Sequence, residues 1–137
     1  MITAIDTNIL LDVLIPNKTF ADASMTAVEE ASNRGALVIC DMVYAELCIH
    51  FASQRECDHF VEETQILVEP LSRAALFHAG RIWREYRTKG GKRARILTDF
   101  FVASHAQAQA DCLLSRDRGF YRDLFPALKV MDPSARG

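Results

Sequence analysis

The sequence predicts an α/β protein built on a parallel sheet. Short apolar runs alternate with longer segments whose apolar residues recur at helical spacing, and this alternation continues along the whole chain. Such alternation is typical of parallel strands connected by helices. The chain has 137 residues, half of them hydrophobic, which argues against disorder and allows a sizeable core. We therefore expect one domain over residues 1–137, folded as an α/β sandwich.

Five apolar runs are expected to form the strands of this sheet. They are short and are bounded by polar residues or by helical patterns, and they cover residues 2–5, 37–40, 66–68, 112–114 and 128–130. The order of these strands in the sheet does not follow from the pattern alone.

The segments between these runs are expected to be helices. Several residues mark their ends: Pro16 stops the first, Gly35 can cap the end of the second, and Asp41, Ser72 and Thr98 can cap the starts of later ones. The resulting helices cover about residues 7–14, 20–33, 42–54, 56–64, 73–88 and 99–109.

Hydropathy and charge exclude some classes of protein. No segment has the roughly 18 unbroken apolar residues of a membrane span. The N-terminus has no basic region before its apolar run, and Asp6 interrupts that run, so we expect no secretory signal and a cytosolic protein. The net charge of −2 does not suggest general attraction to nucleic acid.

Positive charge is nevertheless concentrated in two places. Residues 81–95 carry seven basic residues against Glu85 alone, and a smaller basic group surrounds Asp117. This distribution suits an anionic polymer, although a solvated helix face followed by a polar loop explains residues 81–95 equally well. The candidates for contact with RNA are Arg93, Arg95, Arg116 and Arg118.

The four cysteines do not predict a metal site. Cys40, Cys48 and Cys112 lie in apolar segments and are expected to be small buried hydrophobic residues with reduced thiols. The spacing Cys48-x-His50 and Cys57-x-His59 superficially offers four zinc ligands. Positions two apart on a helix point in different directions, however, so this spacing argues against zinc.

Four acidic residues lie in or beside apolar segments, where acids are least expected. They are Asp6, Glu46, Asp99 and Asp117. A carboxylate among apolar residues must be paired, protonated or bound to a metal ion. Asp6 and Asp117 follow predicted strands, and ligands of open α/β sheets bind beyond the carboxyl ends of strands. We expect the four acids to converge there on one site.

Electrostatics favours a divalent cation at such a site. Two carboxylates about 4 Å apart repel by roughly 4 kcal/mol at an effective dielectric constant of 20. Hard oxygen ligands suit Mg²⁺ or Mn²⁺, which can activate water and stabilise the leaving oxygen of a phosphodiester. Singly, Asp6 and Asp99 could instead cap helices, and Asp117 could occupy a turn. Glu46 has no capping role in the middle of its predicted helix.

Four segments together resemble the motifs of PIN-domain nucleases, in the right order. These are Ile-Asp-Thr-Asn-Ile-Leu-Leu-Asp at 5–12, Val-Tyr-Ala-Glu-Leu at 43–47, Leu-Thr-Asp-Phe-Phe-Val-Ala-Ser-His-Ala at 97–106, and Leu-Leu-Ser-Arg-Asp-Arg-Gly-Phe-Tyr-Arg at 113–122. The length of the chain resembles that of VapC-type toxins of toxin–antitoxin pairs.

This resemblance implies a three-layer sandwich with a five-stranded parallel sheet in the order 3-2-1-4-5. It implies an endoribonuclease that depends on Mg²⁺ or Mn²⁺ and leaves 5′-phosphate and 3′-hydroxyl ends. It assigns Asp6, Glu46, Asp99 and Asp117 to the acidic quartet, with Asn8 orienting the acids and Ser115 near the metal. It further implies an antitoxin partner and a homodimer.

Other residues are expected to lie outside the site. Asp12 and His105 each lie six positions after an acid of the quartet, so helical geometry does not aim them at it; Asp12 should be solvated. The aromatic residues after Asp99 and Asp117 are expected in the core. Two rival functions stay open: a PIN fold that binds RNA or protein without turnover, and a small-molecule phosphatase, although Asn8 breaks the Asp-x-Asp signature of the latter.

Overall fold

The protein forms one parallel five-stranded sheet in the order β3-β2-β1-β4-β5. The computed structural model describes residues 1–15, 19–90 and 97–135. The strand order and the α/β class agree with the expectation from the sequence. The strands are β1 (Thr3–Ile5), β2 (Leu37–Cys40), β3 (Ile66–Glu69), β4 (Cys112–Leu114) and β5 (Val130–Met131).

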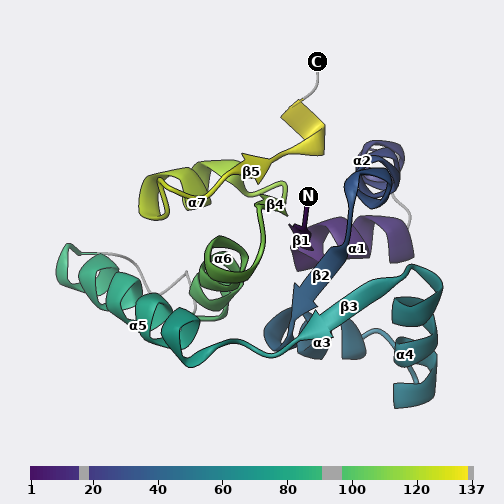
Figure 1. Ribbon diagram of the computed structural model, residues 1–137, viewed down its shortest axis with the longest axis horizontal. Helices are drawn as coiled ribbons and strands as arrows, with labels where there is room; N and C mark the ends of the chain where they lie inside the picture. The colour runs from purple at the N-terminus through teal and green to yellow at the C-terminus, as the bar shows by residue number, and fades with distance from the viewer. Residues whose placement is uncertain (16–18, 91–96, 136–137) are drawn as a thin grey trace.

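Helices lie on both sides of this sheet (Figure 1). One side carries α1 and α2, the other carries α5, α6 and α7, and both α3 and α4 pack beside β3 at one edge. The helices are α1 (Thr7–Leu14), α2 (Ala21–Arg34), α3 (Asp41–Cys48), α4 (Gln54–Glu63), α5 (Arg73–Thr88), α6 (Leu97–Gln109) and α7 (Arg118–Leu124), followed by the 3₁₀ turn η1 (Pro133–Ala135).

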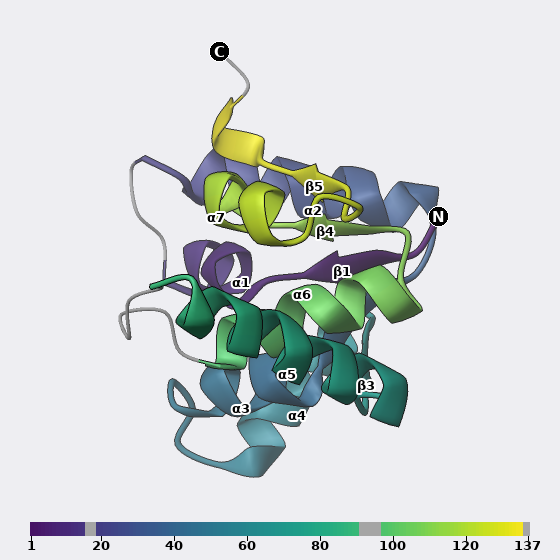
Figure 2. The same cartoon turned by 90° about the vertical axis from the view of Figure 1, so that its left-hand side faces the viewer.

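The pairing of β1 with β4 places two segments that are distant in sequence side by side. Ile5 is paired with Leu114, and the Asp6 amide donates to the Leu114 carbonyl at 3.0 Å. The carboxyl ends of both strands therefore meet at the centre of the sheet, on the side where α1 begins (Figure 2). This is the edge at which open parallel sheets bind ligands.

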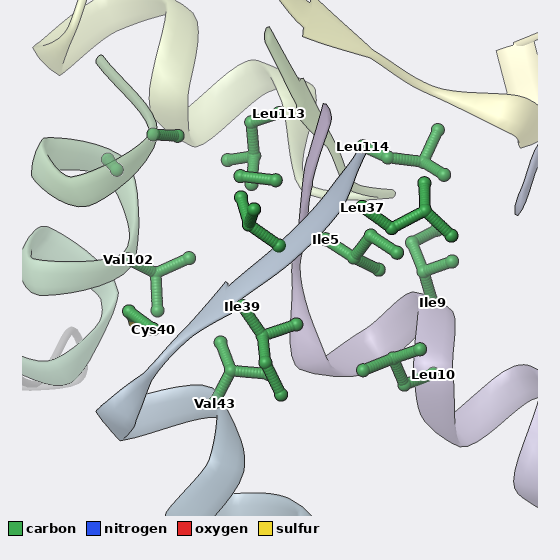
Figure 3. Close-up of a cluster of buried hydrophobic side chains, with 14 of the residues drawn as sticks. Ile5, Ile9, Leu10, Leu37, Ile39, Cys40, Val43, Val102, Leu113 and Leu114 are labelled. Carbon is green, nitrogen blue, oxygen red and sulfur yellow. The ribbon is translucent and has the colours of Figure 1, made fainter. Parts of the chain in front are cut away.

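The core fills the space between the central strands and the helices. Figure 3 shows the side chains of β1, β2 and β4 gathered with those of α1, α3 and α6. Ile5, Ile39 and Leu113 of the central strands are all at most 1% exposed. Central parallel strands covered on both faces are apolar along their whole length, as these are.

Two caps predicted from the sequence are present. Ser72 accepts a hydrogen bond from the Ala75 amide at the start of α5. Gly35 ends α2 with a φ of 155°, and a side chain there would collide with the backbone of Met1. Thr98, by contrast, lies inside α6, which begins at Leu97.

The predicted helix 42–54 was too long, since α3 ends at Cys48. The chain turns at Ile49 and His50, and this turn lets Phe51 pack on Phe60 at a ring distance of 5.8 Å. Ser53 then adopts an extended conformation and caps α4. The tertiary contact between the two aromatic rings overrides the helical pattern.

The segment after β4 also differs from the prediction. The expected strand 128–130 is displaced, because the Leu128 amide closes a turn onto the Phe125 carbonyl and β5 begins only at Val130. The helix α7 was not predicted at all. It is short and rich in arginine, and it is anchored by two buried aromatic side chains, those of Tyr121 and Phe125.

Within the described ranges, no helix is both long enough and apolar enough to cross a membrane.

Candidate active site

Asp6 is the centre of the site. It follows β1, caps α1 and is only 6% exposed. Its Oδ1 accepts from the Thr7 amide at 2.8 Å. Its Oδ2 accepts from Ser115 Oγ at 2.8 Å and from Tyr121 Oη at 2.9 Å, with Asn8 Nδ2 at 3.5 Å. The carboxylate is therefore held in one orientation from three parts of the chain.

Opposing effects act on the pKa of Asp6, and the net effect raises it. Burial, the largest cause, raises the pKa by disfavouring the charged form. The hydrogen bonds from Ser115, Tyr121 and Thr7 lower it, while the negative charge of Asp117 raises it further. Asp6 thus has donors for its ionised form, and its contacts among the described residues include no positive group. A bound cation would relieve this condition.

Glu46 is connected to Asp6 through Thr7. The Thr7 hydroxyl donates to Glu46 Oε1 at 2.9 Å, while the Thr7 amide donates to Asp6. Glu46 lies on α3, which packs against α1. One threonine therefore contacts two of the predicted acids.

Asp117 is connected to Asp6 through Ser115. Ser115 Oγ accepts from the Asp117 amide at 3.0 Å and donates to Asp6. Asn8 Nδ2 donates to the same Ser115 oxygen at 3.3 Å, and Asn8 Oδ1 accepts from the Arg116 amide at 3.2 Å. Asn8 and Ser115 thus connect the Asp6 carboxylate to the backbone of the segment that carries Asp117, and their supporting roles stay a prediction.

Asp99 approaches the same region from α6. It lies in the first turn of that helix. Its charge, together with the charges of Asp6 and Asp117, helps to raise the pKa of the buried Tyr121 hydroxyl, behind burial as the largest cause. The three aspartates therefore lie within electrostatic range of one phenol.

The carboxylates do not form a closed metal cage as they stand. Among the residues that the structure describes, no three acidic, histidine or cysteine side chains lie close enough to enclose an ion. The donor set still suits a hard cation, because carboxylate and hydroxyl oxygens surround the buried Asp6 carboxylate, whose contacts among the described residues include no positive group.

The prediction that Asp12 is solvated was wrong. It is 3% exposed and accepts two hydrogen bonds from the Arg116 guanidinium, from Nε at 2.8 Å and from Nη2 at 3.0 Å. Ser24 Oγ donates to Asp12 at 2.7 Å, and the guanidinium lies 3.9 Å from the centre of the Phe20 ring. Arg116 follows β4, and residue spacing along α1 gives no information about this contact from a distant segment.

This pairing bears on the arginines predicted to contact RNA. Arg116 has its guanidinium engaged by Asp12 and Phe20. Arg118, at the start of α7, is exposed. Arg93 and Arg95 lie outside the described residues, and for all four the contact with RNA stays a prediction.

Sequence reasoning missed two residues of the site and judged others correctly. Thr7 and Tyr121 were not singled out for function, although each lies within one of the four acidic motifs and carries a hydroxyl that could have signalled a role. Phe100 and Phe125 are buried as expected. His105 is also buried and pairs with Glu69 at 3.0 Å instead of reaching the acids.

Some simpler roles of the acids are also present. Asp6 does cap α1, so its capping and site roles coexist. Asp117 occupies the position before α7 without making a capping bond. His59, one of the four residues weighed as zinc ligands, approaches Glu63 at 3.6 Å.

A parallel sheet in the order 3-2-1-4-5, with acidic side chains at the carboxyl edge of its central strands, is the arrangement that the resemblance to PIN domains implied. The family profile of the PIN domain matches residues 3–123. Because this match covers most of the sequence, the chain belongs to the PIN domain family.

Several solved structures have a similar fold. One is VapBC2 from Rickettsia felis bound to a promoter DNA fragment, with a TM-score of 0.74, 22% identity and coverage of 96% of this chain and 98% of that chain. Another is VapBC-1 from nontypeable Haemophilus influenzae, with a TM-score of 0.75, 20% identity and coverage of 98% and 99%. A third is FitAcB from Neisseria gonorrhoeae, with a TM-score of 0.68, 18% identity and coverage of 98% and 99%. A comparison with curated proteins found no match.

Proposed function

We propose that this PIN domain is an endoribonuclease dependent on Mg²⁺ or Mn²⁺, with Asp6, Glu46, Asp99 and Asp117 as its catalytic and metal-binding acids. The observation that carries the proposal is the buried Asp6 carboxylate, which accepts bonds from Ser115 and Tyr121 while Asp117 repels it. A buried carboxylate that has hydrogen-bond donors for its charged form, yet no positive group among those contacts, suits a cation as the missing component.

The chain's own residues have distinct tasks in this proposal. Asp6 is the fixed ligand, because its two oxygens are oriented by several hydrogen bonds. Thr7 positions Glu46, and Ser115 with Asn8 positions the segment that carries Asp117. When bound, a divalent cation would activate a water molecule and balance charge on the scissile phosphodiester. The exposed Arg118 beside Asp117 would contact the RNA backbone.

The test is cleavage of RNA by variants at two of the acids. Asp6→Asn and Asp99→Asn should each lose activity by at least about a hundredfold with Mg²⁺ or Mn²⁺, because each removes a ligand charge. The matched control is Glu62→Gln, an exposed acid on α4 that should keep wild-type activity. Undiminished cleavage by both aspartate variants would exclude this mechanism.

One observation favours a second candidate, a PIN fold that binds RNA or protein without turnover. No closed metal cage exists among the described side chains. Titration with Mn²⁺ discriminates between the two functions. A cation that binds only the native state raises the melting temperature, by the equivalent of about 2.7 kcal/mol at a hundred times its dissociation constant. No stabilisation by either cation, together with retained binding of RNA, would favour the binding module.

We further propose that the protein acts in the cytosol as the toxin of a type II toxin–antitoxin pair, with a cognate antitoxin as partner and a homodimer as its assembly. The names of the structurally similar VapBC and FitAcB complexes support this role. Expression of the wild type should arrest growth of a host, and co-expression of a neighbouring gene product should restore it. Harmless expression of an active enzyme would instead indicate a role in RNA processing. Light scattering would measure the oligomeric state.

A further inference from the structure

Two thiols meet outside the acidic site, where α3 turns into α4. Cys48 is the last residue of α3, and Cys57 lies in the first half of α4. Their sulfur atoms are 3.6 Å apart, although the residues are nine positions apart in sequence. Both are free thiols. The two sulfur atoms are close because the chain reverses direction between α3 and α4.

Contacts on either side of the thiols hold this arrangement without any bond between the sulfurs. Tyr44 Oη donates to Asp58 Oδ1 at 2.6 Å and connects the two helices one turn away. Phe51 packs on Phe60, and the Ala52 amide donates to Glu56 Oε2 at 3.2 Å. Folding has therefore already brought the two thiols together, which gives them a high effective concentration for reaction with each other.

The two thiols differ in their access to solvent. Cys57 is fully buried, and burial followed by the contact with Cys48 raises the pKa of its thiol to about 11. Cys48 is partly exposed at the end of α3. A reagent in solution therefore meets Cys48 first, while Cys57 is placed to react only with a group already on Cys48.

The other two cysteines lack this arrangement. Cys40 and Cys112 are buried in β2 and β4, at 1% and 0% exposure. Cys112 Sγ contacts Thr3 Oγ1 at 3.5 Å and Met1 Sδ at 3.9 Å, neither of which is a thiol. They serve as internal controls for reactivity.

We propose that Cys48 and Cys57 are a redox-active dithiol that closes to an intramolecular disulfide by exchange with a low-molecular-weight disulfide. The Cys48 thiolate attacks one sulfur of that disulfide, and the first small thiolate leaves and takes up a proton. The Cys57 thiol then loses its proton to solvent and attacks the Cys48 sulfur, which expels the second small thiol. The protein loses two electrons and two protons, and the small disulfide is reduced to two thiols.

The bond would tie the end of α3 to α4. Because α3 also carries Glu46, two residues before Cys48, closure braces the helix that supplies one of the predicted acids. A cross-link between these helices restricts the unfolded chain and should raise the melting temperature by several degrees. In a reducing cytosol the dithiol stays open, and it closes under oxidising conditions.

The test uses the full chain in buffers of defined ratios of oxidised to reduced glutathione. Samples are quenched with acid, alkylated and digested with trypsin, which cuts after Arg55 and so separates the two cysteines. The expected product joins the peptide of residues 35–55 to that of residues 56–73 through Cys48 and Cys57, and reduced glutathione reverses it. Fragmentation of the peptides distinguishes Cys48 from Cys40, which lies in the same peptide.

Comparison with the unfolded chain makes this result quantitative. The equilibrium constant for closure should be at least about tenfold larger in the native protein than in concentrated urea, because only the fold holds the sulfurs together. An equal or smaller constant in the native protein, or no cross-link at saturating oxidised glutathione, would overturn the proposal. So would a melting temperature that does not rise on closure.

Single variants test the order of the two steps. Cys57→Ser should stop at a mixed disulfide on Cys48, and Cys48→Ser should leave Cys57 at least about tenfold slower to react than Cys48 in the wild type, because Cys57 is buried. Cys112→Ser should form the cross-link as the wild type does. A mixed disulfide that accumulates on Cys57 in place of Cys48 would contradict the proposed sequence of attack. None of these measurements depends on cleavage of RNA.

Discussion

The Tyr121 hydroxyl donates a 2.9 Å hydrogen bond to Asp6 Oδ2 across 115 positions of sequence. Both groups are buried, and the bond joins the arginine-rich helix α7 to the end of β1. A buried phenol that donates to a carboxylate stabilises its ionised form. Tyr121 is thus both a core residue and part of the environment that sets the charge of Asp6.

Replacing Tyr121 with phenylalanine should shift the pH dependence of cleavage. The hydrogen bond lowers the pKa of Asp6, so its loss raises that pKa and moves the acidic limb of the kcat/KM profile to higher pH. The unfolding free energy should fall by about 1–2 kcal/mol, because a buried bond to a carboxylate is lost. Tyr44→Phe is the matched control. It removes a hydroxyl bond to Asp58 outside the site and should leave the pH profile in place.

The stability of the metal-free protein should depend on the protonation of Asp6. Burial is the main cause that raises its pKa above 3.8, so the folded chain binds this proton more tightly than the unfolded chain. The stability that the proton contributes is complete below the unfolded pKa and is lost as pH rises through the folded pKa.

Wild type should therefore lose unfolding free energy relative to Asp6→Asn as pH rises from below the unfolded pKa of Asp6 through its raised folded pKa, in the presence of a chelator. Urea unfolding measures this difference. Addition of Mn²⁺ at neutral pH should recover the lost unfolding free energy in the wild type but not in Asp6→Asn. A difference that stays constant with pH would show that Asp6 does not titrate as its surroundings predict.

The pair of Asp12 and Arg116 should stabilise the fold at the base of the site. Loss of a partner from a buried ion pair costs about 3–5 kcal/mol, and the 26% exposure of the Arg116 side chain reduces the expected cost of Asp12→Ala to about 2–3 kcal/mol. A double-mutant cycle with Arg116→Met isolates the interaction from the contact of Arg116 with Phe20. Additive effects of the two substitutions would indicate that the ion pair contributes nothing.

Thr7→Val should reduce cleavage without unfolding the protein. Valine keeps the shape of threonine and the amide bond to Asp6, but it removes the hydroxyl that orients Glu46. We expect kcat to fall by about tenfold, equivalent to roughly 1.4 kcal/mol of lost positioning. Thr26→Val, at an exposed position on α2, controls for the loss of a helical threonine hydroxyl. Unchanged kcat for Thr7→Val would remove Thr7 from the site.

Arg118→Gln should weaken RNA binding in a salt-dependent way. A side chain that neutralises one phosphate contributes about one unit to the slope of log affinity against log salt concentration. The variant should show a smaller slope and a higher KM, with the same melting temperature. Arg73→Gln, exposed at the start of α5, is the control for removal of one positive charge. If Arg118→Gln and Arg73→Gln show the same dependence of RNA affinity on salt concentration, the RNA does not contact α7 through Arg118.

The sequence by itself determined the class of the fold and drew attention to several polar residues that the fold brings together. The alternation of apolar runs and helical patterns predicted the α/β class, and the resemblance to PIN domains implied the strand order 3-2-1-4-5 that is observed. The alternation is a local feature, because hydrophobic periodicity and capping act over a few residues. The embedding of Asp6, Asn8 and Ser115 in or beside apolar segments was also visible locally, and all three lie together in the structure.

Only the tertiary structure decided which partners the polar side chains found. Asp12 looked solvated along its own helix, but the loop after β4 brings Arg116 to it from 104 positions away. The same folding places Tyr121 on Asp6 and closes the sulfurs of Cys48 and Cys57 to 3.6 Å. The physical reason is that burial, ion pairing and thiol proximity depend on contacts distant in sequence, which periodicity along one element does not encode.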